Sequence, residues 1–349
     1  MPEGRDRREP GAFTPSEAVQ RYLRRRQQDA TEESVKSYHY RLKQFVEFCE
    51  DEGIERVDAL RPFDLDEFYE IRAADIAPAT LKGQMHTVRG FLRYLAQIDA
   101  VDGDLPESVQ IPRLSEEEEV SEEVWDYEIA LTALDHWAEH DPGCRDHALM
   151  ELLLITGARR GGIRALDVQD VYLDEQYVDF VNRPDTGTRL KKGKDGERPV
   201  AIPDRTVEVL RQWLARRPDT HDEHGRAPLL PSQRGRPTKS AIAGWVYAAT
   251  VPCIWTDCPH ERERETCDWT LANSASHCPS SVSPHPVRSG SMTYQRDLGF
   301  PKEVVAERCN ASVETVDKHY DAATARQRME ERRRRYVERF DSLSDTNDE

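Results

Sequence analysis

The segment DLPESVQIPRLSEEEEVSEE, residues 104–123, constrains the fold of this chain more than any other feature. It holds two prolines and then a run of glutamates, and a run of like charges repels itself and packs poorly. We therefore predict an acidic interdomain linker, with a boundary near residue 115. With 349 residues, the chain is long enough for a domain of ordinary size on each side of it.

The residues before the linker predict a helical domain over 14–103. Residues 14–17, Thr-Pro-Ser-Glu, have the pattern of a capping box with proline at the first helical position. Apolar residues at helical spacing predict a second helix from about Thr31. Two more helices are expected at 62–73 and 78–97.

One face of the helix expected at 78–97 carries positive charge. Its members follow one another at spacings of four, three and four: Lys82, His86, Arg89 and Arg93. This spacing places them in one stripe beside the apolar face. The stripe contains no acidic residue, although the chain has 66 acidic and 49 basic residues. A solvated helix face is the alternative, but we interpret the stripe as a surface that contacts DNA phosphates.

The residues after the linker predict a second domain over 124–335, followed by an acidic tail at 336–349. Residues 177–203 contain two or three short strands joined by Gly, Asp and Pro turns. Helices are expected at 122–139 and 144–156, after a turn at Gly161 and Gly162, and at 206–217 and 241–250. The predicted fold class is therefore mainly α with a small β-sheet (α+β).

Composition limits the environment of the chain. The net charge is −17, and 40 of the 49 basic residues are arginine; an acid-rich, lysine-poor surface is typical of extreme halophiles. Regular apolar periodicity argues against disorder, the alternative reading of the low hydrophobic content. Residues 1–13, expected to be disordered, lack the apolar region of a secretory signal, and no stretch approaches the roughly 20 apolar residues of a membrane span. A cytoplasmic location is therefore expected.

Four elements in the second half carry residues suited to phosphate chemistry. The first is LLITGARRGGIRALDVQDV at 153–171, with an arginine pair after Thr156-Gly157. The second, at 189–203, holds three of the nine lysines: Lys191, Lys192 and Lys194. Such clustering indicates a need for the ammonium group, a titratable donor that arginine cannot imitate. The third is SPHPVRSG, with His285 and Arg288, and the fourth is Tyr320.

In this order the four elements resemble the phage integrase family of tyrosine recombinases, Xer-like enzymes. The family's T-G-x-R box matches residues 156–159 and its H-x-x-R box matches 285–288, while Tyr320 follows Arg288 by 32 residues. The resemblance assigns the catalytic roles to Arg159, Lys192, His285, Arg288 and Tyr320, with Lys194 and then Lys191 as alternatives for the lysine. It covers essentially residues 14–335, including an N-terminal SAM-like core-binding domain that clamps DNA.

The resemblance implies a site-specific recombinase that cleaves and rejoins double-stranded DNA through a 3′-phosphotyrosine, without a cofactor. It also implies a homotetramer on two DNA sites. The residue types fit this chemistry independently: two guanidinium groups can clamp the non-bridging oxygens, and a histidine can donate a hydrogen bond to the phosphate or assist proton transfer. A lysine can protonate the 5′ oxygen, and a tyrosine can attack phosphorus. Two alternatives remain, a type IB topoisomerase-like nicking and closing enzyme and a non-catalytic, zinc-stabilised DNA-binding regulator.

The chain departs from the family pattern at two positions. Gly162 stands where the family normally has a glutamate, so the packing around Arg159 is expected to differ. Ala311 stands nine residues before the tyrosine, where a histidine or tryptophan is usual. Asn310 is a candidate to serve in its place, whereas His319 should face another direction on a helix.

A cysteine-rich insertion at 252–279 separates the second and third elements. Four cysteines with turn-forming neighbours, in a compartment that does not favour disulfides, predict a structural zinc site. The predicted ligands are Cys253, Cys258, Cys267 and Cys278. The alternative is four unrelated small residues. A closed metal site would hold the chain that runs into His285 rigid.

Overall fold

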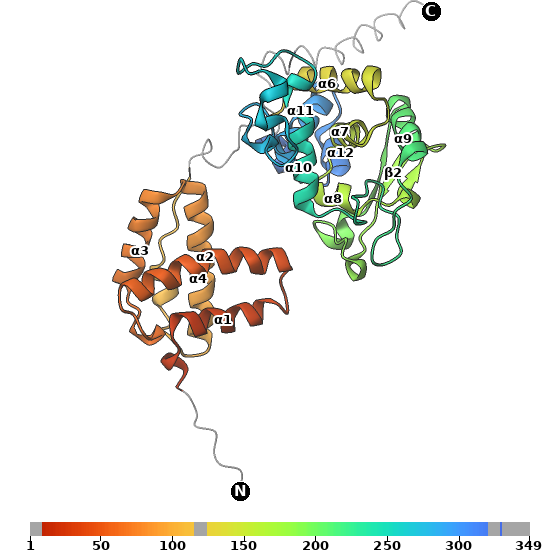
Figure 1. Cartoon of the computed structure of the whole chain (residues 1–349). Helices are drawn as coiled ribbons and strands as arrows, with labels where there is room; N and C mark the ends of the chain where they lie inside the picture. The colour runs from red at the N-terminus through yellow and green to blue at the C-terminus, as the bar shows by residue number, and fades with distance from the viewer. Residues whose placement is uncertain (1–8, 115–123, 320–328, 330–349) are drawn as a thin grey trace, which may run out of the picture. The chain divides into compact units, whose positions relative to one another are not determined.

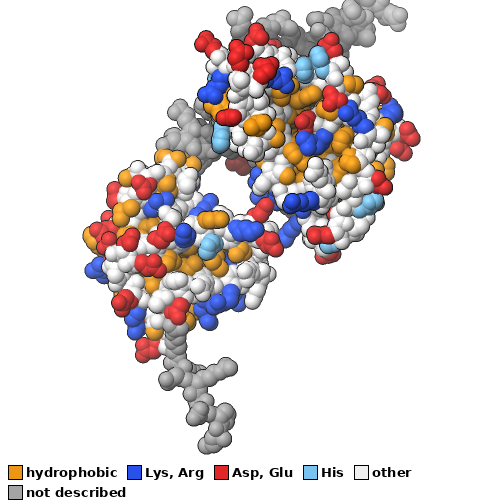
Figure 2. Space-filling model, in the orientation of Figure 1, with side chains coloured by type: hydrophobic (Ala, Val, Ile, Leu, Met, Phe, Trp, Pro, Cys, Tyr) orange, Lys and Arg blue, Asp and Glu red, His pale blue; other side chains and the backbone are white. Residues whose placement is uncertain are grey.

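The computed structural model describes residues 9–114 and 124–319 together with Met329. The chain divides into two compact units, an N-terminal unit of Met1–Ser121 and a C-terminal unit of Glu122–Glu349 (Figure 1). Figure 2 shows acidic side chains spread over the visible surface of each unit, with basic side chains interspersed among them. In the described part of the chain, no helix is long and apolar enough to cross a bilayer.

Four helices form the N-terminal unit. They are α1 (Pro15–Arg26), α2 (Glu32–Asp51), α3 (Pro62–Asp75) and α4 (Pro78–Gln97), with short 3-10 turns η1 (Pro10–Ala12), η2 (Val57–Ala59) and η3 (Leu105–Ser108). The predicted capping box is confirmed, because Glu17 N donates to Thr14 Oγ1 (3.2 Å) and Thr14 N donates to Glu17 Oε2 (3.0 Å). The core is built on edge-to-face rings, in which Phe45 contacts Phe68 and Phe91.

The start of the predicted linker was wrong. Leu105 and Val109 are buried in the core of the N-terminal unit, so this part of 104–123 packs with the helices instead of connecting two domains. The reason is that η3 turns the chain back onto α4, which buries both apolar side chains. The division of the chain between Ser121 and Glu122 lies in the acidic run that follows.

Helices surround a small sheet and one central helix in the C-terminal unit. The helices are α6 (Tyr127–His140), α7 (Arg145–Thr156), α8 (Arg160–Ala165), α9 (Asp204–Arg216), α10 (Lys239–Ala249), α11 (Pro284–Asp297), α12 (Lys302–Cys309) and α13 (Val313–His319). Strands β1 (Val171–Tyr172), β2 (Tyr177–Phe180) and β3 (Arg198–Ala201) form an antiparallel sheet in this order. The predicted fold class is confirmed.

Helix α7 forms the centre of this unit. It contacts α6, α9, α10 and α11 (Figure 1), and every side chain from His147 to Leu154 is buried, the polar His147 and Glu151 included. It ends at Gly157, which adopts a left-handed conformation with φ of 57°. The predicted turn at Gly161 and Gly162 was wrong, because the chain already turns at Gly157 and both later glycines lie inside α8.

The chain enters the C-terminal unit across α11. Trp125 is buried, and its backbone N–H donates to the carbonyl of Pro286 (3.1 Å) in the first turn of α11. One turn later, Gly290 has no room for a side chain because the Trp125 carbonyl lies against it. The entry segment is thus packed backbone to backbone on this helix.

A buried ionic network fixes the segment that follows α8. Asp167, only 1% exposed, accepts hydrogen bonds from Arg226 Nε (2.7 Å) and Arg236 Nη2 (2.5 Å), and Arg183 Nη1 lies 3.5 Å away. Arg236 also pairs with Asp222 (2.7 Å). The network therefore ties the end of α8 to two distant loops.

We predict that Asp167→Ala lowers the free energy of unfolding by about 3–5 kcal/mol, because it leaves buried guanidinium groups without their shared carboxylate. The measurement is urea unfolding followed by tryptophan fluorescence, which reports on this unit alone because all six tryptophans lie between residues 125 and 269. Glu208→Ala, which removes an exposed pair with Arg211, is the control and should change little. Equal effects of the two substitutions would contradict the prediction.

Candidate active site

Arg288 joins three helices at the centre of the candidate site. It lies on α11 and is 2% exposed. Its Nη1 atom donates to the carbonyl of Gly157, at the end of α7, and to the carbonyl of Cys309 (2.6 Å), at the end of α12. The H-x-x-R arginine is therefore held from two directions by backbone oxygens.

Arg159 lies beside this junction. Helix α7 stops at Gly157, and Arg159 then takes an extended conformation as the N-cap residue of α8. Gly157 has no room for a side chain, because Cys309 Sγ lies against its Cα atom. The half-buried Arg159 side chain donates from Nη1 to the carbonyl of Asn310 (2.6 Å). The structure thus brings the two predicted arginines to the same helix end.

The C-terminal end of α12 accepts three guanidinium groups on three consecutive carbonyls. Arg198 Nε donates to Arg308 O (2.7 Å), Arg288 Nη1 donates to Cys309 O, and Arg159 Nη1 donates to Asn310 O. Carbonyls at this position lack partners within the helix, and the helix dipole makes this end negative. Arginine side chains from three other elements therefore converge where one helix ends.

Arg198 is a member of this cluster that the sequence did not reveal. It begins β3 and stacks over the Phe180 ring, 4.3 Å from its centroid. Burial and the nearby guanidinium groups of Arg288 and Arg159, only partly offset by Cys309, lower the pKa of Arg198 to about 10. In a chain with 40 arginines, nothing local distinguishes this one.

The lysine cluster lies in the connection between β2 and β3, not in a tight hairpin. Lys191, Lys192 and Lys194 are all exposed, and η6 (Gly193–Gly196) follows the first two. The carbonyl of Lys191 accepts a hydrogen bond from Asn310 Nδ2 (3.1 Å). The lysine connection is therefore attached to the same helix end as the arginines.

The remaining predicted groups lie on α11 and beyond α13. His285 is exposed in the first turn of α11, one turn before Arg288. Tyr320 lies outside the described residues; α13 ends at the residue before it. Val316 of α13 is buried in a small apolar cluster with Met292 and Val305, which packs α13 against α11 and α12. Ala311 packs beside this cluster.

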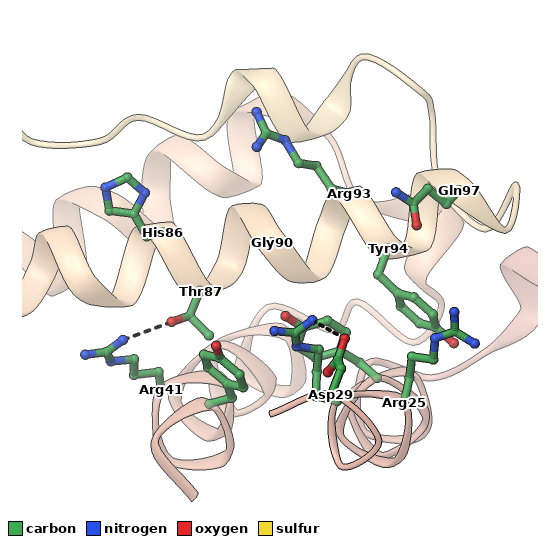
Figure 3. Close-up of a pocket in the computed structure, with 12 residues that line it drawn as sticks. Arg25, Asp29, Arg41, His86, Thr87, Gly90, Arg93, Tyr94 and Gln97 are labelled. Atoms are coloured by element: carbon green, nitrogen blue, oxygen red, sulfur yellow. Dashed lines mark hydrogen bonds and ion pairs between the residues drawn. The ribbon is translucent and has the colours of Figure 1, made fainter. Parts of the chain in front are cut away.

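The positive stripe of α4 borders a hollow in the N-terminal unit (Figure 3). The hollow has a volume of about 530 Å³, and its lining includes four arginines and three tyrosines: Arg25, Arg26, Arg41, Arg93, Tyr22, Tyr38 and Tyr94. The arginines of α1 and α2 were not predicted. Burial and the cations Arg89, Lys82 and Arg41 lower the pKa of His86, which favours the neutral form of this imidazole.

An acidic residue does accompany the stripe, contrary to the sequence reading. Arg93 Nη2 pairs with Glu107 Oε1 of η3 (2.9 Å). The two residues are 14 positions apart, so the helical spacing of the stripe could not reveal the pair. Near the other end, Arg89 Nη2 lies 3.2 Å from His86 Nδ1.

Of the four predicted zinc ligands, Cys253 lies in a 3-10 turn (Pro252–Ile254), whereas Cys258, Cys267 and Cys278 lie in the loop segments beside such turns. Burial first, and then the neighbouring thiols of Cys258 and Cys278, raise the pKa of Cys253. All seven cysteines are free thiols. Within 9–114 and 124–319, no three His, Cys, Asp or Glu side chains are arranged so that they could hold a metal ion.

Comparison with known proteins identifies the family. The N-terminal SAM-like domain of phage integrases matches residues 19–98, and the phage integrase family matches 127–249; together the two models cover more than half of the chain. The chain belongs to the phage integrase family of tyrosine recombinases. The second match includes Arg159 and Lys192 and ends just before the cysteine-rich insertion.

Similar proteins include tyrosine recombinase XerC of Psychromonas ingrahamii, 27% identical over 44% of this chain and 47% of that protein. The chain aligns with only 30% to 60% of the length of the curated relatives that it matches. In fold it is similar to the Tn1549 transposon integrase in complex with transposon right end DNA (TM-score 0.63, 14% identity, 91% of this chain and 99% of that one). It is also similar to a lambda integrase dimer bound to a COC′ core site (TM-score 0.61, 12% identity, 90% and 80%).

We predict that Gly162→Glu, which restores the usual family residue, destabilises the C-terminal unit. A Cβ atom at Gly162 would lie 3.3 Å from the buried Phe180 ring, and overpacking costs about 1–3 kcal/mol. Gly161→Glu is the matched control, since its Cβ atom would meet only the end of Lys239 at 3.5 Å and the gain in helix propensity is the same. In urea unfolding followed by tryptophan fluorescence, the urea concentration at the midpoint should fall for Gly162→Glu and stay unchanged for Gly161→Glu.

Proposed function

We propose that this chain is a site-specific DNA recombinase that cleaves and rejoins DNA through a 3′-phosphotyrosine at Tyr320. The observation that carries the proposal is the convergence of Arg159 and Arg288 on the end of α12, the helix that leads through α13 to the tyrosine. A cluster of guanidinium groups suits an anion that gains charge during the reaction. The family membership supports recombination as the overall activity.

Each residue has a role in the proposed reaction. The Tyr320 hydroxyl oxygen attacks phosphorus and loses its proton, with His285 assisting the transfer, while the bond to the 5′ oxygen breaks. Lys192 donates a proton to that oxygen, which leaves as a hydroxyl group. Arg159 and Arg288 bind the non-bridging oxygens. In the reverse sense, a 5′ hydroxyl attacks the phosphotyrosine and returns its proton to the lysine, so no ATP is consumed.

Double-stranded DNA is the proposed partner, on two grounds. The similar Tn1549 and lambda integrases have structures with DNA. In the N-terminal unit of this chain, the stripe of α4 borders a hollow whose lining holds arginines and tyrosines (Figure 3), and such cations suit the phosphates of DNA. We propose that this surface contacts the DNA backbone, and that a homotetramer acts on two sites, as in the family.

A structural zinc ion in the insertion is a second proposal. Residues 252–279 form only short 3-10 turns around a small cluster of Val251, Ala275 and Cys278, which is little apolar burial for a segment of this length. A metal ion would supply the missing stabilisation. To bind it, the cysteine side chains would have to lie closer together than they do in this structure.

We predict that the purified protein forms a covalent adduct with a suicide DNA substrate carrying its own site, in molar salt as the acidic surface suggests. Tyr320→Phe should abolish the adduct, because the nucleophile is removed, while retaining DNA binding. The control is Tyr294→Phe, which changes a tyrosine whose ring stacks on Tyr127. This variant should form the adduct normally. An adduct without strand exchange would indicate a topoisomerase-like enzyme, and bound DNA without any adduct would favour a regulator.

We predict about one zinc ion per chain in protein purified without added metal, measured by elemental analysis. Cys258→Ser should lose the ion, and limited proteolysis should then cut within the insertion. Cys144→Ser, outside the insertion, is the control and should keep the metal. A zinc content well below one per chain in the unsubstituted protein would disprove the zinc proposal and leave the recombinase proposal untouched.

A further inference from the structure

Asn310 connects two parts of the candidate site. It ends α12 in the left-handed conformation, with φ of 53° and ψ of 51°, which asparagine tolerates better than most residues. Its carbonyl accepts the hydrogen bond from Arg159 Nη1 (2.6 Å). Its side-chain amide donates from Nδ2 to the carbonyl of Lys191 (3.1 Å). One residue thus touches both an arginine of the phosphate site and the lysine connection.

The lysine loop, residues 190–197, is also held by contacts within the β2–β3 connection and by Arg198 of β3, whose Nη1 atom donates to the carbonyl of Gly196 (3.1 Å). Leu190 N donates to Asn182 Oδ1 (2.9 Å), and Asn182 N donates to Glu197 Oε1 (3.0 Å). Gly196 is buried against the Lys191 carbonyl, and a Cβ atom there would lie 2.8 Å from Asn310 Nδ2. The glycine therefore leaves the space in which the asparagine amide reaches the loop.

The contact with Asn310 bears most directly on Lys192. The Lys191 carbonyl belongs to the planar peptide group that joins Lys191 to Lys192, so holding this oxygen fixes the backbone at which Lys192 begins. Lys192 is exposed and has a φ of 72°, a conformation that costs free energy for a residue other than glycine. Such strain persists only where surrounding contacts impose it.

We infer that Asn310 is a positioning residue, which holds the lysine loop so that the Lys192 ammonium can protonate the departing 5′ oxygen of a phosphate bound at Arg159. The inference rests on the proposed recombinase function. It selects Lys192 among the three clustered lysines. It also means that Asn310 does not replace the histidine or tryptophan usual at position 311, but acts on the leaving group through the lysine.

The chemistry of the leaving group separates this role from a merely structural one. An alkoxide is a poor leaving group and needs a proton, whereas a thiol ionises near pH 8.5 and leaves as a thiolate without one. A suicide substrate with sulfur in place of the bridging 5′ oxygen therefore bypasses the lysine. Contacts to the non-bridging oxygens are needed with both substrates.

The test compares the cleavage rates of variants on the oxygen and sulfur substrates. Asn310→Gly keeps the left-handed backbone and the carbonyl that binds Arg159, and it removes only the amide. We expect cleavage of the oxygen substrate to slow by about 10–100-fold, part of the 10²–10⁴-fold that general acid catalysis supplies, and cleavage of the sulfur substrate to change less than about threefold. Lys192→Ala should show the same pattern more strongly, and Arg159→Ala should slow both substrates.

A second variant guards against a folding defect in the first. In Asn310→Asp, the aspartate also tolerates the left-handed conformation, but it turns a carboxylate oxygen toward the Lys191 carbonyl. This variant should therefore show the same slowing of cleavage, and only on the oxygen substrate. Equal slowing of both substrates by the two variants, or no slowing of either, would overturn the positioning role while leaving the recombinase proposal standing. Failure of the unsubstituted protein to form an adduct with either substrate would overturn both.

Discussion

The hydrogen bonds from three arginines to the last carbonyls of α12 are the interaction on which the candidate site depends. A buried guanidinium group loses its hydration, and carbonyl oxygens at the negative end of a helix replace part of it. Hydrogen bonds to charged groups contribute about 1.5–3 kcal/mol each. The positions of Arg159, Arg198 and Arg288 are therefore set by where one short helix ends, and a change in the length of α12 would move all three together.

The location of the charged residues in this protein matters more than their sum. The chain carries 17 more negative than positive charges, yet arginines gather around α12, where burial first, and then the neighbouring cations, lower the pKa of Arg198 to about 10. Elsewhere arginines are matched to carboxylates, as at the buried Asp167. The cations around α12 are held mainly by neutral carbonyls, so their positive charge is not cancelled by carboxylates there, as the proposed binding of phosphate would require.

Structural features that depend on residues within about one helical turn of each other could be predicted from the sequence. Contacts between segments that are far apart in the chain could not. The capping box at Thr14 and the end of α7 at Gly157 depend on neighbouring residues and were predicted correctly. The fold class followed from the apolar spacing and turn residues of the expected helices and strands, and the family followed from the order of the motifs. The contacts of Arg198 and Asn310 span more than 100 residues and leave no local pattern, and the pairing of Arg93 with Glu107 joins two elements. The glycine pair of α8 was mistaken for a turn because glycine is common in turns, whereas here Gly162 lies inside a helix and close to the distant Phe180 ring.

The way the chain enters the C-terminal unit gives α11 a mechanical position. The Trp125 backbone is bonded to Pro286 and lies against Gly290, so Trp125 is anchored on the helix that carries His285 and Arg288. A force applied to the backbone of Trp125 would act first on this helix, before it reaches the sheet or the lysines. Arg288 in turn bridges α7 and α12, and a load on α11 would be shared by both.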